Sequence, residues 1–236
     1  MSNLTLLYSA KNKEEIPINN KKIYLDKLFP KINGVNIQNL MIDIESILYI
    51  TTPYDSKYIT DIISYNILKY KSSHESTIVD ASGGAGGDTI MFSTMFRTVI
   101  SIEKDTTRYK FLKHNVNEYK LKNVITINDD SINILPKITT LDIIYVDPPW
   151  GGKSYKGKEN LRLVFGMTSL EQFILNCFDE NILTSPPKII ALKLPINYDL
   201  KYLYECISDK FDAHLYKLKK FNIIIIEKII IHHQNN

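Results

Sequence analysis

The chain has 236 residues, of which 44% are hydrophobic and 23% charged, and its formal net charge is +3. This length suffices for one complete domain with a sizeable core, and the composition excludes wholesale disorder. The small net charge excludes a general nucleic-acid coat, and no apolar run reaches the roughly 18–20 residues of a membrane-spanning helix.

The N-terminus and the cysteine count indicate the compartment. Residues 1–13 lack a basic start followed by an apolar core, so they show no secretory signal. Two cysteines, Cys177 and Cys206, are too few for a disulfide framework or a zinc cluster, which favours a reducing compartment. We therefore expect an intracellular protein of the nucleus or cytoplasm, with no membrane segment and no metal site.

In chain order, residues 1–40 are polar and weakly periodic. We therefore predict a loose arm and a small substrate-side extension over residues 1–54, before one domain over residues 55–236. The segment 55–70 has apolar residues at helical spacing behind the start signal Thr51-Thr52-Pro53, which predicts a helix. Asp88 is expected to cap a second helix, which runs to about residue 95. Other helices are predicted at 105–119, 170–183 and 200–210, and strands at 77–81, 98–102, 124–127, 141–146 and 188–194.

The C-terminal segment predicts a β-hairpin, with residues 214–219 and 223–231 on either side of the turn Lys220-Phe221-Asn222. The alternation of strands and helices before it predicts a mostly parallel sheet with helices on both faces, to which the hairpin adds an antiparallel strand. The expected fold is therefore α/β, and its ligands should bind beyond the carboxyl ends of the strands.

A glycine-rich turn follows the first strand of this sheet, at Gly83-Gly84-Ala85-Gly86. Glycines let the backbone pass close under a bound nucleoside. Glu103 ends the next strand, twenty residues after Gly83, where a carboxylate can accept both hydroxyls of an unmodified ribose. Asp80, just before the turn, could accept from the ligand or could fix the turn.

Later positions narrow the class of ligand. Asp130, at the end of the third strand, could accept the exocyclic amine of an adenine, while Ser131 donates through its backbone. Asp88, an acidic residue at the start of a helix, disfavours a diphosphate there. S-adenosylmethionine carries a sulfonium and no phosphate, so it fits better than a nicotinamide dinucleotide. A turn with only a packing role is the remaining alternative.

The fourth strand runs into Asp147-Pro148-Pro149, where consecutive prolines hold the backbone rigid. Asp147 and the carbonyl of Pro148 can both accept from an exocyclic amine. Fixing the N–H groups of such an amine orients it for in-line attack on a methyl group. This segment therefore predicts the acceptor side of a methyl transfer.

Trp150, the only tryptophan of the chain, comes directly after these prolines, where a target base would arrive. Indole stacks best on a cationic base, and guanine methylated at N7 is one; the alternative is a core role. Gly151-Gly152 leave room for a flat ligand. The loop 153–158, with Tyr155, is basic and could hold a phosphate chain or simply be solvated.

These segments resemble the catalytic domain of the trimethylguanosine synthase family. The resemblance is carried by residues 79–90, 99–105 and, most specifically, 148–152, and it extends over about residues 43–228. It implies a Rossmann-like class I methyltransferase with a seven-stranded sheet. It also implies S-adenosylmethionine as cofactor and the exocyclic N2 of an N7-methylguanosine RNA cap as acceptor. The small size and composition suggest a viral or protist member, and a monomer is favoured.

The residues themselves and the resemblance to the family together predict the site residues. By resemblance, Asp80, Gly84, Gly86, Glu103 and Asp130 hold the cofactor, and the turn and strand ends add Gly83, Ala85 and Ser131. The predicted catalytic residues are Asp147, Pro148 and Trp150, and the predicted substrate-binding residues are Trp150, Lys153, Tyr155, Lys193 and Asn197.

Two positions depart from the family. Asp147 stands where the family has Ser, which could tighten amine binding or change the number of methyl groups added. Ile196 replaces the Arg of a Leu-Pro-Arg-Asn turn, so Lys193 or the loop 153–158 must substitute if that Arg touches the cap phosphates. The alternatives are an adenine-N6 or ribosomal guanine-N2 methyltransferase, and a cap-binding module without catalysis.

Overall fold

The computed structural model describes residues 6–8, 15–17 and 25–229. The chain divides into two compact units, residues 1–131 and 132–236. Within the described part of the chain, none of the helices is both long and apolar enough to cross a lipid bilayer. Cys177 and Cys206 form no disulfide, and burial raises the pKa of the Cys177 thiol.

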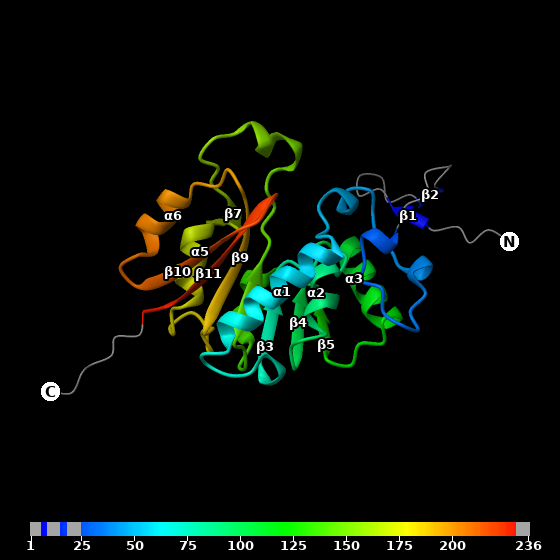
Figure 1. The fold of residues 1–236 in the computed structure, drawn as a ribbon, viewed down its shortest axis with the longest axis horizontal. Helices are drawn as coiled ribbons and strands as arrows, with labels where there is room; N and C mark the ends of the chain where they lie inside the picture. The colour runs from blue at the N-terminus through cyan, green and yellow to red at the C-terminus, as the bar shows by residue number, and fades with distance from the viewer. Residues whose placement is uncertain (1–5, 9–14, 18–24, 230–236) are drawn as a thin grey trace. The chain divides into compact units, whose positions relative to one another are not determined.

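The first unit contains three parallel strands in the order β3-β4-β5. All four residues of β3 are buried, as is typical of a strand covered on both faces. Helices α1 and α2 lie side by side in front of β3 and β4 in Figure 1. The elements are β3 (Thr77–Asp80), β4 (Thr98–Ile102), β5 (Val124–Ile127), α1 (Pro53–Ile67), α2 (Gly87–Phe92), α3 (Thr106–Glu118) and the 3-10 helix η4 (Ser73–Glu75).

The N-terminal extension packs onto this unit. Most of the predicted arm lies outside the described residues, although β1 (Leu6–Tyr8) pairs antiparallel with β2 (Glu15–Pro17). Three short 3-10 helices follow, η1 (Leu25–Lys27), η2 (Ile37–Asn39) and η3 (Ser46–Leu48). Their apolar residues share a buried cluster with the turn after β3 and with α2 and α3; its members are Leu25, Phe29, Leu40, Ile42, Ala85, Ile90, Phe111 and Tyr119. The boundary predicted after residue 54 stays a prediction.

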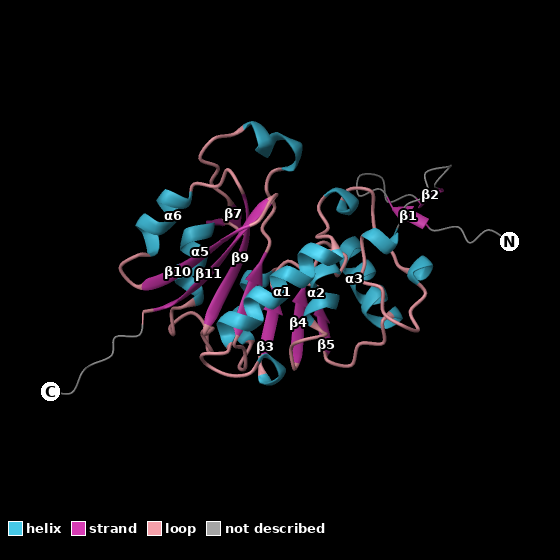
Figure 2. Ribbon diagram, in the orientation of Figure 1, coloured by secondary structure: helices cyan, strands magenta, loops and turns pink. Residues whose placement is uncertain are grey.

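The second unit contains four strands in the order β6-β9-β11-β10, with β6 parallel to β9 and the other pairs antiparallel. Figure 2 shows its helices α5 and α6 beside these strands. The elements are α4 (Ser131–Ile134, at the boundary of the units), η5 (Leu135–Lys137), β6 (Ile143–Val146), η6 (Gly152–Gly157), β7 (Val164–Phe165), β8 (Thr168–Ser169), α5 (Leu170–Cys177), β9 (Ile189–Pro195), α6 (Leu200–Ile207), β10 (Phe211–Lys217) and β11 (Phe221–Lys228).

The two units contribute three and four strands to a seven-stranded, mostly parallel sheet with a C-terminal antiparallel hairpin. The predicted α/β class is therefore confirmed. The start signal of α1 is confirmed as well, because the Thr52 side chain accepts the N–H of Asp55 and Pro53 opens the helix.

Several boundaries were predicted wrongly, among them the start of α2, the end of α5 and the start of β11. The N-cap of α2 is Gly86, not Asp88, whose carboxylate instead accepts from the Thr51 hydroxyl at 2.7 Å. Helix α5 ends at Cys177, before the predicted end at residue 183, and in the turn that follows the Asp179 side chain accepts the N–H of Asn181. Strand β11 begins at Phe221, inside the predicted turn, because this apolar residue is buried and pairs with Pro195 of β9.

Candidate functional site

Glu103 directly follows β4 and holds the glycine turn. Its Oε2 accepts the N–H of Gly84 at 2.8 Å, its Oε1 accepts the N–H of Asp105 at 2.8 Å, and Nε of Arg108 lies 3.6 Å from Oε1. The residue is only 8% exposed. A carboxylate has about four acceptor positions, so these contacts leave capacity for a ligand's hydroxyl groups. The structure thus places Glu103 against the turn, and its predicted contact with a ribose stays a prediction.

Asp80 is buried at the end of β3 and fixes the turn. Its Oδ1 accepts the N–H of Ser82 at 3.2 Å, and its Oδ2 accepts the Thr89 hydroxyl, which lies 2.7 Å from the Ser101 hydroxyl. Two roles were predicted for Asp80, and the structure shows one of them, which is to fix the turn. A direct contact with a ligand stays a prediction.

The glycines of the turn have different reasons for their identity. A Cβ on Gly83 would lie 2.3 Å from the Ser101 hydroxyl oxygen, so this glycine is required by the protein's own packing. Gly86 caps α2 with a φ of +97°, a conformation that side chains rarely adopt. Gly84 also has a positive φ, +54°, but a Cβ there would meet nothing closer than a carbonyl oxygen at 4.0 Å. Gly84 is therefore where a ligand can approach the backbone.

Asn115 of α3 belongs to this site and was missed by the sequence analysis. It is fully buried, and its Nδ2 donates to the carbonyls of Ala85 and Met41, each at 2.8 Å. Its Oδ1 accepts the N–H of Met41 at 2.8 Å. Asn115 therefore joins the glycine turn to the N-terminal extension. The available signal was a polar residue on the buried face of α3, between Leu112 and Val116.

We expect Asn115→Ala to lower the free energy of unfolding by about 2–4 kcal/mol, because buried backbone groups of Met41 and Ala85 lose their partners. Urea denaturation measures this. Asn117→Ala, at an exposed position of the same helix, is the control and should stay within about 0.5 kcal/mol of wild type. Equal effects of the two substitutions would contradict the role of Asn115.

Asp130 and Ser131 follow β5. The Asp130 carboxylate pairs with the Lys104 ammonium at 2.7 Å, and this hydrogen bond and its charge raise the pKa of Lys104. The Ser131 hydroxyl is buried and donates to the carbonyl of Ala81 at 2.6 Å, which ties the end of β5 to the turn after β3. Their predicted contacts with an adenine stay predictions.

Asp147, directly after β6, forms an ion pair with a lysine of the neighbouring strand. Nζ of Lys193 lies 2.7 Å from its Oδ2, and the Lys193 side chain is only 5% exposed. The same Nζ lies 5.6 Å from the ring centroid of Trp150 and 5.3 Å from that of Phe221. Lys193 is thus a buried ammonium paired with Asp147, and its predicted role toward the cap phosphates stays a prediction.

The second unit also positions the Trp150 indole. Its ring meets that of Tyr155 edge to face, with centroids 5.2 Å apart. Nδ2 of Asn197 donates to the carbonyls of Tyr155 at 2.7 Å and Lys158 at 2.6 Å, so Asn197 holds the loop that follows Trp150. Trp150 is partly buried, and within the described residues its Nε1 is buried without a hydrogen-bond partner.

The other predicted acceptor-side residues differ in exposure. Pro148 is buried and Pro149 exposed, while Ile196, after the end of β9, is exposed. The side chain of Lys153 lies outside what the structure describes. The second unit therefore brings together Asp147, Lys193, Trp150 and Tyr155, and Asn197 secures their loop.

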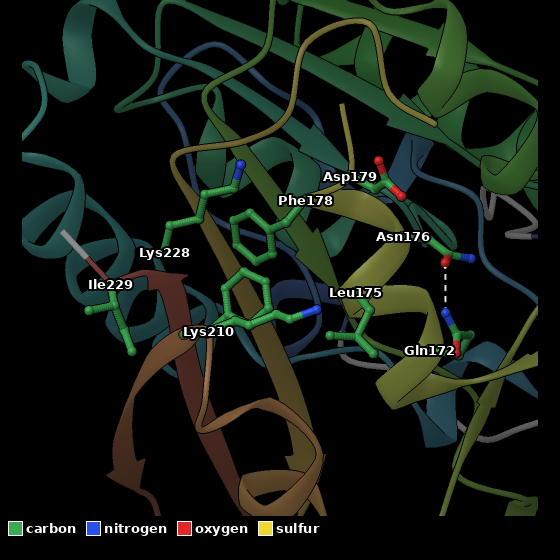
Figure 3. A pocket seen from close by; sticks show the side chains of 9 residues that line it. Gln172, Leu175, Asn176, Phe178, Asp179, Lys210, Lys228 and Ile229 are labelled. Atoms are coloured by element: carbon green, nitrogen blue, oxygen red, sulfur yellow. Dashed lines mark hydrogen bonds between the residues drawn. The ribbon is translucent and has the colours of Figure 1, made fainter. Parts of the chain in front are cut away.

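A cavity of about 480 Å³ lies elsewhere in the second unit, between α5 and the strands β10 and β11. Figure 3 shows Lys210, Phe178 and Lys228 along it. Strand register separates it from Lys193, since Lys193 pairs with Ile223 whereas this cavity lies at the far end of β11. Over the described ranges, no group of three or more His, Cys, Asp or Glu side chains is placed to hold a metal ion.

Comparisons with known proteins identify a family model and several relatives that match this chain. Residues 75–232 match the model of the RNA cap guanine-N2 methyltransferase family. The chain is 33% identical over 220 residues to the uncharacterised protein L320 of Acanthamoeba polyphaga mimivirus, covering 85% of this chain and 84% of that protein. It is 33% identical over 133 residues to the trimethylguanosine synthase of Schizosaccharomyces pombe, covering 53% of each chain.

More distant matches cover the same fold. The ribosomal RNA small subunit methyltransferase J of Francisella tularensis subsp. novicida is 32% identical over 139 residues, which cover 54% of this chain and 58% of that protein. The chain thus spans little more than half the length of this and the fission-yeast relative. The structure of the tRNA (m1A58) methyltransferase TrmI from Aquifex aeolicus aligns with a TM-score of 0.51 and 18% identity, covering 77% of this chain and 70% of that one.

Proposed function

The chain belongs to the RNA cap guanine-N2 methyltransferase family, and from this premise we propose that it methylates the exocyclic N2 of an N7-methylguanosine cap on RNA. S-adenosylmethionine is the proposed methyl donor. The observation that carries the proposal is the family match over residues 75–232, which includes both the turn held by Glu103 and the segment from Asp147 to Trp150.

The first unit fits the proposed cofactor. The backbone is open at Gly84, and the buried Glu103 carboxylate directly beside it can accept two ribose hydroxyls. Asp130 would accept from the adenine amine. When bound, S-adenosylmethionine supplies an electrophilic methyl group on a sulfonium. The turn offers no cluster of cations for a diphosphate, and Asp88 at the start of α2 opposes one.

The second unit fits the proposed acceptor. Asp147 and the carbonyl of Pro148 would accept from the guanine amine, and the Trp150 indole would stack on the methylated base. The loop 153–158 would contact the cap phosphates through lysine side chains. An RNA substrate and two unbridged cysteines favour work in the nucleus or cytoplasm. The proposed enzyme acts as a monomer.

Incubation with methyl-labelled cofactor tests the proposal. The acceptors are N7-methylguanosine triphosphate (m7GTP), GTP, capped RNA, small-subunit ribosomal RNA and an adenine-containing oligonucleotide. We expect methylation of m7GTP and capped RNA, at a rate at least tenfold above that of GTP, and mass analysis counts the methyl groups. Transfer to ribosomal RNA alone would favour the activity named in the Francisella relative and would contradict our proposal.

We expect Glu103→Ala to weaken binding of S-adenosylhomocysteine roughly 10- to 100-fold, because charge-assisted bonds to the ribose are lost together with the anchor of Gly84. Calorimetric titration measures the Kd. Glu75→Ala, at an exposed position before β3, is the matched control and should bind as wild type does. Unchanged affinity in Glu103→Ala would remove this residue from the cofactor site.

A further inference from the structure

The Trp150 indole already has a cation close to it. Nζ of Lys193 lies 5.6 Å from the ring centroid, within the distance at which an ammonium interacts with an aromatic ring. The Lys193 side chain is 5% exposed, so water screens its charge only weakly. Left alone, this ammonium would oppose a second cation at the same ring.

Asp147 supplies the compensating charge. Its Oδ2 lies 2.7 Å from Nζ, so the pair has no net charge. A purine methylated at N7 is itself a cation, whereas an unmethylated guanine is neutral. The net charge of the pair should therefore affect the binding of the methylated purine much more than the binding of unmethylated guanine.

We propose that the Lys193–Asp147 pair determines the preference for a cationic base: the Asp147 carboxylate cancels a buried ammonium that would repel a positively charged purine stacked on Trp150. Asp147 is thus a specificity-determining residue, in addition to its proposed contact with the acceptor amine. Lys193 is a positioning residue that acts through Asp147. This inference rests on the proposed function and deepens it.

Three variants test this role of the pair, because each gives it a defined net charge. Asp147→Asn gives +1, Lys193→Met gives −1, and the double substitution Asp147→Asn/Lys193→Met restores zero. Loss of an amine contact at position 147 affects m7GTP and GTP alike, because both carry the same exocyclic amine. The ratio of their affinities therefore isolates the charge effect.

Fluorescence measures this ratio directly, because Trp150 is the only tryptophan of the chain. Quenching titrations with m7GTP and GTP give both Kd values for each protein, and thermal melting verifies that each variant is folded. We expect the preference for m7GTP to fall about tenfold in Asp147→Asn, to rise in Lys193→Met, and to return to the wild-type value in the double variant. If Asp147→Asn does not fold, the preferences for m7GTP over GTP of Lys193→Met and of the double variant still test the inference, because only the first should exceed that of wild type.

Equal preference in all the folded proteins would overturn the inference and leave the proposed function in place, since wild type would still favour m7GTP. A double variant as unselective as Asp147→Asn would also overturn it. A wild-type protein that binds GTP as well as m7GTP would overturn the proposed function and the inference with it.

Discussion

Trp150→Ala is expected to lower kcat/KM for m7GTP about a hundredfold while leaving the Kd for S-adenosylhomocysteine within twofold of wild type. Stacking of a base on an aromatic side chain contributes about 1–3 kcal/mol, and the positive charge of the methylated base adds about 1–2 kcal/mol. The cofactor affinity should hold, because the residues proposed to bind the cofactor lie in other segments of the chain.

Two further variants distinguish a loss of base stacking in Trp150→Ala from a loss of structure. Trp150→Phe keeps an aromatic face and should lose only about tenfold, since phenyl attracts a cation less strongly than indole. Tyr65→Ala, which removes an exposed aromatic ring from α1, should have no effect. If Trp150→Ala keeps the wild-type preference for m7GTP over GTP, the indole is a packing residue and not the base platform.

Asp147→Ser, which introduces the residue of the trimethylguanosine synthase family, is expected to lower the free energy of unfolding by about 3 kcal/mol. The substitution leaves the Lys193 ammonium buried without its carboxylate, and removing one partner of a buried ion pair typically costs about 3–5 kcal/mol. We take the lower end because Asp147 itself is partly exposed. Denaturant unfolding measures the change.

The double variant Asp147→Ser/Lys193→Met should recover most of this loss, because it also removes the buried ammonium. Asp61→Ser is the matched control, since it breaks an ion pair of the same 2.7 Å length whose side chains are exposed. That control should change stability by less than about 1 kcal/mol. A stable Asp147→Ser protein, or a double variant no better than the single one, would show that the pair does not support the fold.

Much of the fold could be predicted because its signals are local. Apolar, β-branched runs such as the one in β3 mark buried parallel strands, and glycine, proline and capping residues mark where elements begin and end. The placement of Glu103 against the glycine turn was also predictable, since parallel neighbouring strands bring their carboxyl ends to one edge. Predicted boundaries failed where a contact between distant segments accompanies them, as at Phe221, which pairs with Pro195 of β9 and begins β11 inside the predicted turn.

The sequence by itself therefore determined the order of the main helices and strands, and it predicted the two segments that we propose carry the chemistry. Only the tertiary structure decided what charges and hydrogen bonds surround them. Lys193 interrupts an apolar strand and was predicted to bind the substrate, and the structure buries it against a carboxylate 46 residues away. Asn115 reaches Met41 across 74 residues. Such pairs form because burial removes water from polar groups, which must then find partners wherever the fold supplies them, and a local sequence pattern does not contain that information.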